Sequence, residues 1–202
     1  MGVLLLFDYT MMRGLASHSF VEWLMAVNDL FSSFPLRMRV EAQALSRVYV
    51  RESDCFAVHG SVPPALNTSV LYSFNDPVIN VCRGEISALS EFPSDLIVTP
   101  VYRLEPNGPQ GVPSGNVFIR FRPQISVEVR QKEIEACGFS IRESLSYAPH
   151  AAWLRSRDGN IATALNSIAK LRDLNDVELV EPQMLIKRVQ RSSDNSLSNA
   201  PP

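Results

Sequence analysis

The sequence predicts an α+β fold, in which a C-terminal domain of four strands and two helices follows a smaller N-terminal region of mixed helices and strands. Three observations support this prediction. Apolar residues alternate with period two in short segments of the C-terminal half. Two segments with helical spacing lie between them. A stretch rich in proline and glycine separates this half from the rest of the chain.

Residues 1–104 are expected to form the N-terminal region. Its clearest element is a helix over residues 19–31, where apolar side chains repeat at helical spacing and Pro35 follows the end. This apolar stripe is expected to pack on the rest of the domain. Beyond the helix, strand-like runs separated by turn-forming residues cover 47–50, 55–58, 70–74 and 96–104. No motif in this region indicates a role.

Residues 105–115 contain three prolines and three glycines in eleven positions. That mixture opposes both helix and sheet, because proline removes a backbone donor and glycine loses conformational entropy when it is ordered. We therefore predict a surface linker over 105–115, with the domain boundary inside it. At the other end, residues 192–202 are predicted to be a flexible polar tail.

The predicted C-terminal domain covers residues 116–191. Apolar and polar side chains alternate from residue 117 to 121, which predicts a strand with one buried face, and Pro123 ends it. Ser126 is placed to cap the following helix, which Gly138 ends. The remaining predicted elements are strands over 139–145 and 150–156, a helix over 161–171, and a strand over 177–180 with an extended continuation over 184–189.

Two helices that cross one face of a four-stranded antiparallel sheet form the ferredoxin-like βαββαβ arrangement. Such a sheet leaves its other face open, so that face must be solvated or covered by a partner. Phe118 and Trp153 are expected on the strands of this sheet, either in the core or facing a partner.

Charge and composition disfavour several classes of function. The chain has a net charge of −2, with −4 over residues 1–115 and +3 over residues 116–191, which is too weak to indicate nucleic-acid binding. The three cysteines are far apart and the three histidines are isolated, so we expect buried thiols, no metal and no cofactor. We do not expect an enzyme, because no nucleophile and base occur at a recognisable spacing.

The N-terminus does not have the pattern of an export signal. The apolar run over residues 3–7 is short, no basic residue precedes it, and Asp8 interrupts it. No apolar run approaches the roughly 20 residues of a membrane-spanning helix. We therefore expect a soluble protein with no membrane partner, and the compartment stays unassigned.

The C-terminal segments resemble the prodomains of subtilisin-like serine proteases. VFIRFRP at residues 117–123 is similar to the opening V-x-V-x-F-x-P strand of that family, and PHAAWL at 149–154 resembles its P-N-A-Y-x-V strand. VELVEP at 177–182 is similar to the V-E-Y-V-E-P ending. The likeness covers about 75 residues, and it rests on the order and spacing of segments with few fixed letters.

The resemblance implies a pro-region that assists folding of a subtilisin-like catalytic domain, as an intramolecular chaperone, and then inhibits it. It implies that the open sheet face packs on the catalytic domain and that the Glu181 carboxylate caps a partner helix. The segment after the last strand would lie in the substrate cleft as an added strand. The implied partner-binding residues are Glu178, Glu181, Met184, Leu185, Ile186, Lys187, Arg188, Val189, Gln190 and Arg191.

The sequence departs from that family in two respects. Pro182 and Gln183 follow Glu181, so a second acidic cap found in some relatives is missing. No catalytic domain follows within the 202 residues, so we expect either a released or truncated pro-region or a free-standing inhibitor.

Two other functions stay open. An RNA-binding domain can have the same βαββαβ order, although residues 150–156 lack the aromatic-rich third strand that stacks bases in such domains. A regulatory module that binds a small ligand is the other alternative, although no glycine-rich ligand loop supports it.

Overall fold

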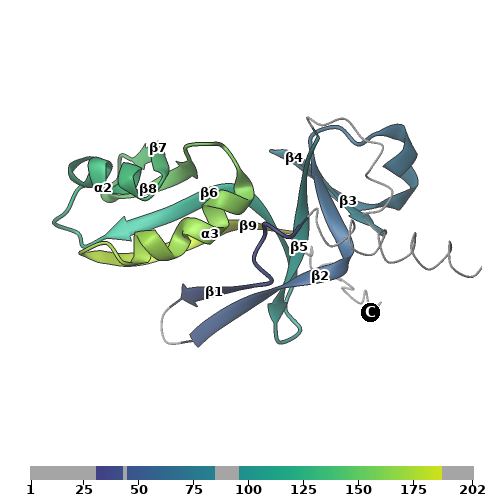
Figure 1. Cartoon of the computed structure of the whole chain (residues 1–202), viewed down its shortest axis with the longest axis horizontal. Coiled ribbons are helices and arrows are strands. Elements are labelled where there is room, and N and C mark those ends of the chain that lie inside the picture. Colours follow the sequence, from purple (N-terminus) through teal and green to yellow (C-terminus); the bar gives the residue numbers. More distant parts are fainter. Residues whose placement is uncertain (1–30, 43–44, 85–95, 188–202) are drawn as a thin grey trace, which may run out of the picture.

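The computed structural model describes residues 31–42, 45–84 and 96–187, which form a nine-stranded sheet with short helices (Figure 1). The strands are β1 (Arg37–Ala42), β2 (Leu45–His59), β3 (Val70–Asn75), β4 (Val78–Arg83), β5 (Ile97–Glu105), β6 (Gln110–Phe121), β7 (Phe139–Leu145), β8 (Ala148–Ser156) and β9 (Val177–Ile186). The helices are the 3-10 helices η1 (Pro64–Ser69) and η3 (Val127–Arg130) and the α-helices α2 (Gln131–Ala136) and α3 (Ile161–Arg172).

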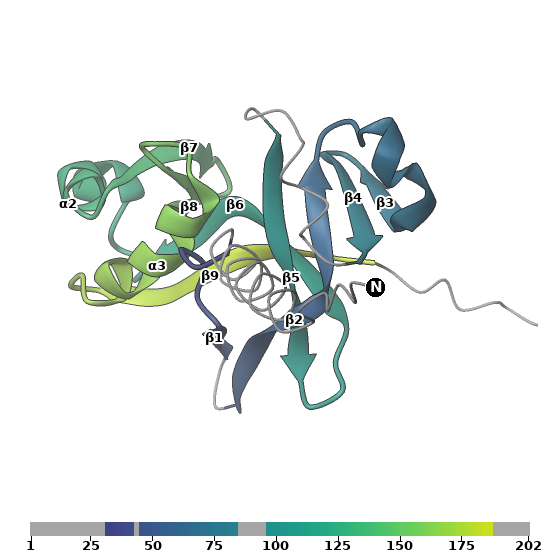
Figure 2. The same cartoon turned by 45° about the vertical axis from the view of Figure 1, so that its right-hand side comes forward.

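Two long strands hold the sheet together, and the neighbouring strands run antiparallel to them. β2 pairs with β1 along its first half and with β4 along its second, while β5 follows its other edge. Gln110 and Gly111 at the start of β6 pair with β5 and residues 116–120 pair with β8, while β9 follows the other edge of β6. β6 therefore carries the sheet from the N-terminal strands to the C-terminal ones, as Figure 2 shows.

The predicted α+β, ferredoxin-like fold class is wrong for this chain. The described residues are mostly antiparallel β-sheet, with nine strands and two α-helices of 6 and 12 residues. The order strand–helix–strand–strand–helix–strand predicted for 116–191 occurs from β6 to β9, but as one part of the larger sheet. The chain is therefore not described as ferredoxin-like.

The proline- and glycine-rich segment is the physical reason for the difference. Residues 105–115, expected as a linker, contain the end of β5, a turn and the first half of β6. Gly111, Val112 and Pro113 pair with the end of β9, and Gly111 also pairs with Tyr102 of β5. Composition disfavoured a strand here, but a paired strand on each side supplies the hydrogen bonds that favour one. The division of the chain into two domains stays a prediction.

The N-terminal strands also differ from the prediction in detail. The runs 47–50 and 55–58 belong to the single strand β2, whose pairing with β5 is irregular between Arg51 and Phe56. The runs 70–74 and 96–104 correspond to β3 and β5, whereas β1 and β4 were not predicted. The predicted helix over 19–31, apart from Phe31, and the predicted tail over 192–202 lie outside the described residues.

The largest hydrophobic core lies between the sheet and the helices α2 and α3. It buries alternate residues of β6, including Val117, Ile119 and Phe121, against Ile134 of α2 and Leu171 of α3. Burial of each such side chain contributes roughly 1.5–3 kcal/mol. The same core includes residues from β1, β2 and β5, namely Met38, Val40, Tyr49 and Tyr102. Residues from both ends of the described chain therefore share one core.

The helix ends agree only in part with those predicted from the sequence. Asn160 caps α3, because its side-chain oxygen accepts a hydrogen bond from the Thr163 backbone N–H at 3.1 Å. Gly138 has a φ of +91°, so the chain leaves α2 through the left-handed region that glycine favours. Ser126 makes no cap contact and donates to the Glu128 carboxylate at 2.6 Å instead, so its predicted role was wrong. None of the helices in the described ranges is long and apolar enough to cross a membrane.

Candidate functional site

The candidate site is the face of the β7–β8–β6–β9 part of the sheet that lies opposite α2 and α3. Because Val117, Ile119 and Phe121 point toward the helices, the residues between them point to the other face. The strand register extends this second face onto β7, β8 and β9. We call it the aromatic face, and its residues are Asn116, Phe118, Arg120, Glu143, Trp153, Arg155, Leu179 and Glu181.

Two aromatic rings lie at the centre of the aromatic face. Phe118 of β6 is directly opposite Trp153 of β8, and the ring centroids are 5.2 Å apart with an edge-to-face angle of 61°. Such a pair contributes about 0.5–1.5 kcal/mol beyond its burial. Both side chains are only partly buried, although their neighbours toward the helices are fully buried. The sheet therefore presents two large aromatic rings that its own helices do not cover.

Charged and amide side chains surround the two rings. Arg120 forms an ion pair with Glu178, with Nε and Oε2 3.3 Å apart, and both side chains are partly exposed. Arg142 of β7 donates to the Asn116 side-chain oxygen at 2.7 Å. The Asn116 amide in turn donates to Gln183 at 2.9 Å. An exposed ion pair adds little stability, up to about 1 kcal/mol. The main effect of these contacts is therefore to fix the orientation of the polar side chains that surround the two rings.

Glu181 lies beside Phe118, because the two residues are opposite each other in the register of β9 and β6. Burial raises the pKa of the Glu181 carboxyl, and the positive charges of Arg172, Arg120 and Arg47 oppose that rise in pKa. Glu181 is therefore a half-buried carboxylate next to the two aromatic rings. A hydrogen-bond donor from a bound partner would compensate for the water that the carboxylate has lost.

The predicted partner-binding residues do not all lie on this face. Glu178 and Glu181 lie on it or at its rim, whereas Met184 packs against the largest core and Leu185 against a separate core around Val112. Ile186 ends β9 and is 38% exposed. The Lys187 ammonium lies 5.0 Å from the centroid of the Tyr72 ring. Arg188, Val189, Gln190 and Arg191 lie outside the described residues.

Residues 184–186 were expected to be an extended segment after the last strand, but they belong to β9. They pair with Pro113, Val112 and Gly111 in the first half of β6. The sequence placed a linker at those β6 residues, so no partner strand for 184–186 could be anticipated. Phe118 and Trp153 were named as possible partner-facing residues, and the alternation of β6 and β8 was the signal for their face.

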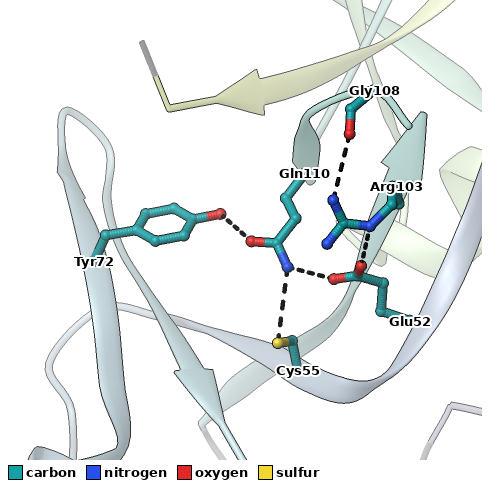
Figure 3. Close-up of polar contacts among 6 residues, drawn as sticks. All are labelled: Glu52, Cys55, Tyr72, Arg103, Gly108 and Gln110. Carbon is teal, nitrogen blue, oxygen red and sulfur yellow. Dashed lines mark hydrogen bonds and ion pairs between the residues drawn. The ribbon is translucent and has the colours of Figure 1, made fainter. Parts of the chain in front are cut away.

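The sequence did not reveal a polar network that joins β2, β3, β5 and β6 (Figure 3). Glu52, at the irregular part of β2, accepts hydrogen bonds from Arg103 of β5 and Gln110 of β6. Gln110 accepts from the Tyr72 hydroxyl at 3.2 Å and donates to the Cys55 sulfur at 3.8 Å. The partners are 38 to 58 residues apart in the sequence, so no local motif could indicate the network.

These side chains form a structural brace between the strands, and they are not arranged as a metal site or a reactive thiol. Oxygen atoms of Glu52 and Asp54 and the Cys55 sulfur lie within 4.8 Å of one another, which is close enough to consider a metal site. However, Glu52 already accepts from two donors. Burial and the neighbouring carboxylates raise the pKa of the Cys55 thiol, which keeps it protonated at neutral pH. A protonated thiol is a poor nucleophile and a poor metal ligand.

His59, near the end of β2, is within hydrogen-bond distance of a buried hydroxyl group. Its Nε2 atom is 3.1 Å from the Thr99 Oγ1 atom, and Thr99 is fully buried. Burial lowers the pKa of His59 to about 4, so the ring is neutral near pH 7. Because substrate cannot reach the Thr99 hydroxyl, this pair stabilises the end of β2 and does not form a nucleophile–base pair.

No protein-family model, characterised protein or solved structure matches this chain.

Proposed function

We propose that the chain is a pro-region of a subtilisin-like serine protease, which binds the catalytic domain, assists its folding and inhibits it. The observation that carries the proposal is the aromatic face, with Phe118 and Trp153 at its centre and Glu181 beside them. The similarity of residues 117–123, 149–154 and 177–182 to prodomain strands supports the choice of partner.

The composition of the aromatic face is that of a protein-binding surface. Protein interfaces are enriched in tryptophan, phenylalanine and arginine at a central patch, and a polar rim surrounds that patch. Here Phe118 and Trp153 form the centre, while Arg120, Glu178 and Arg142 belong to the rim. A partner that covers the two rings would desolvate them against apolar surface, which supplies binding energy in proportion to the area buried.

Inhibition in this proposal uses the chain beyond β9. Because β9 ends at Ile186, the segment that enters the substrate cleft begins at Lys187. The aromatic face holds the catalytic domain, and the segment from Lys187 onward lies in the cleft as an added strand. Trimming the chain after Ile186 should therefore weaken inhibition more than it weakens binding.

The direct test is inhibition of a subtilisin-like protease by the purified chain, followed by mass spectrometry of the chain. We expect slow, tight inhibition with eventual cuts after Ile186. Trp153→Ala should weaken inhibition at least tenfold, the size expected for a central aromatic residue, which corresponds to about 1.4 kcal/mol. The matched control is Tyr147→Ala, because Tyr147 is 84% exposed in the turn before β8 and lies outside the aromatic face. Rapid digestion without inhibition would contradict the proposal.

Single-stranded nucleic acid is the second candidate, because two neighbouring aromatic rings on a sheet face can stack bases. The carboxylates of Glu143, Glu178 and Glu181 on or beside the same face would repel the phosphate backbone. We therefore expect no binding of a fluorescent single-stranded oligonucleotide at physiological salt. Binding that Trp153→Ala abolishes and Tyr147→Ala preserves would favour this candidate over the protease partner.

A further inference from the structure

One end of the aromatic face carries two arginines. Arg155 lies two residues beyond Trp153 on β8, so it points to the same face, and it is directly opposite Asn116 of β6. Arg142 of β7 reaches the same position, because its Nη1 atom donates to the Asn116 side-chain oxygen at 2.7 Å. Both arginine side chains therefore belong to the end of the face that contains Asn116, and we call Arg142 and Arg155 the cationic end.

Irregular strand pairing directs Arg142 toward this end. The register of β7 with β8 shifts between Ile141 and Glu143, which leaves Arg142 without a residue opposite it on β8. Such a bulge turns a side chain away from regular alternation. Asn116 lies at a second irregularity, in the pairing of β6 with β9. The hydrogen bond between Arg142 and Asn116 therefore joins two places where the sheet departs from regular pairing.

An amide network fixes the orientation of Arg142. The Gln183 side-chain oxygen accepts hydrogen bonds from the Asn116 amide at 2.9 Å and from the Ser114 hydroxyl at 2.6 Å. Because the Asn116 nitrogen donates to Gln183, the Asn116 oxygen is the atom that accepts from Arg142. A guanidinium group that is already held in place loses less conformational entropy when it binds a partner.

The positive charge of the cationic end is not paired within the described residues. Arg142 and Arg155 are both exposed, and neither has a described carboxylate within ion-pair distance. Glu143 shares the face but forms no such pair with them. At the opposite end of the face, Arg120 does pair with Glu178. The aromatic face therefore carries a paired charge at one end and an unpaired positive charge at the other.

We propose that the cationic end binds a carboxylate side chain of the protease, next to the apolar surface that covers Phe118 and Trp153. This inference rests on the proposed function and adds the chemistry of the surface that the catalytic domain presents. Guanidinium groups bind carboxylates through charge-assisted hydrogen bonds, which are stronger than neutral ones. Because Arg155 is two residues from Trp153, the carboxylate lies roughly 7 Å along β8 from the apolar contact.

The cationic end also gives the aromatic face a direction. A catalytic domain placed the other way round would bring its carboxylate to the Arg120–Glu178 pair, where the positive charge is already paired. Complementary charges of this kind set the orientation of partners and speed their association. The two rings then supply apolar contact, and the two arginines determine which way the catalytic domain lies across the sheet.

The test compares inhibition of a subtilisin-like protease by the original chain and by Arg142→Gln/Arg155→Gln, at low and high ionic strength. The double variant should inhibit about tenfold more weakly at low ionic strength and depend less on salt, because the lost contacts are between charged groups. The matched control is Lys132→Gln/Lys170→Gln. It removes the same charge from exposed positions on α2 and α3, on the other side of the sheet, and should inhibit like the original chain.

Arg155→Gln alone tests the contact without disturbing the amide network. The Arg155 side chain forms no hydrogen bond or ion pair within the described residues, so this variant should unfold in urea like the original chain. It should still weaken inhibition about threefold at low ionic strength, as expected for one charged contact at the rim of an interface. Unchanged inhibition by Arg155→Gln and by the double arginine variant would overturn the carboxylate contact.

Trp153→Ala distinguishes failure of this inference from failure of the proposed function. If Trp153→Ala weakens inhibition while the arginine and lysine double variants behave alike, the carboxylate contact is overturned and the protease partner stands. If the original chain does not inhibit, both are overturned. Binding of a single-stranded oligonucleotide that the double arginine variant abolishes would assign the cationic end to phosphate, and it would likewise overturn the carboxylate contact.

Discussion

A single buried residue, His59, makes the stability of the fold depend on pH. The pKa of His59 is about 4 in the folded chain, below its ordinary value of 6.5, because burial disfavours the charged ring. Between these two values the unfolded chain binds more protons than the folded chain, so stability falls as the pH is lowered. The stabilisation is complete above pH 6.5 and is lost progressively toward pH 4.

We therefore expect the free energy of unfolding to decrease by up to about 3 kcal/mol between pH 7 and pH 4 through His59 alone. Urea unfolding at several pH values measures this decrease. His59→Gln keeps a polar group near Thr99 but cannot titrate, so its stability should vary less over the same range. If the variant and the original chain lose stability in parallel, His59 is not the group responsible.

Gly115 illustrates a second constraint at the scale of one residue. It has a φ of +88°, and a Cβ atom at this position would lie 3.0 Å from Cγ1 of Ile161. Gly159 has a φ of +70° with no atom within 4 Å of such a Cβ. Both alanine variants should destabilise the chain through left-handed strain, but Gly115→Ala should cost about 1 kcal/mol more because of the contact. Equal costs in urea unfolding would contradict the close approach of β6 to α3.

At the scale of elements, local pattern predicted the helices and strands that have clear periodicity. Alternation over 117–121 located the second half of β6, and apolar spacing over 161–171 located α3. The sequence pattern gave a wrong prediction where pairing with neighbouring strands outweighs an unfavourable amino-acid composition. Pro113 and Gly111 opposed a strand at residues 110–115, but Gln110 and Gly111 pair with β5, and Gly111, Val112 and Pro113 pair with β9. Because the end of β9 depends on that pairing, its extent through Ile186 was missed for the same reason.

The cap of α3 gives a prediction for one element. Asn160 accepts from the Thr163 backbone N–H, so Asn160→Ala leaves a helix donor without its side-chain partner. We expect a loss of about 1 kcal/mol in the free energy of unfolding. Asn175→Ala, in the exposed turn before β9, is the matched control and should change stability by less than about 0.5 kcal/mol. Equal small effects for the two variants would show that the cap does not stabilise α3.

At the scale of the whole molecule, the candidate site was only partly predictable. Phe118 and Trp153 could be named from strand alternation, because alternation fixes which residues share a face, whereas Glu181 was named only through the resemblance to prodomains. The brace around Gln110 could not, because its residues come from strands far apart in the sequence. The shared core has the same origin, since Met38 and Tyr102 pack with Ile119 and Leu171.

This shared core predicts one cooperative unfolding transition for the described residues. The Tyr102 hydroxyl donates to the Pro35 carbonyl at 2.9 Å, and Tyr102 is fully buried between the N-terminal and C-terminal strands. Amide exchange monitored along the chain in increasing urea should show β2, β5, β6 and β8 opening together. Separate opening of the N-terminal strands and the C-terminal strands would instead support the two-domain division predicted from the sequence.

The most direct test of the account is hydroxyl-radical footprinting of the chain, alone and bound to an inactivated subtilisin-like catalytic domain. Radical oxidation reports the solvent exposure of individual side chains. We predict that Phe118 and Trp153 become protected in the complex, while Tyr147, which is 84% exposed and lies outside the aromatic face, stays reactive. A complex in which Trp153 remains as reactive as in the free chain, or the absence of any complex, would contradict the proposal that the aromatic face binds the protease.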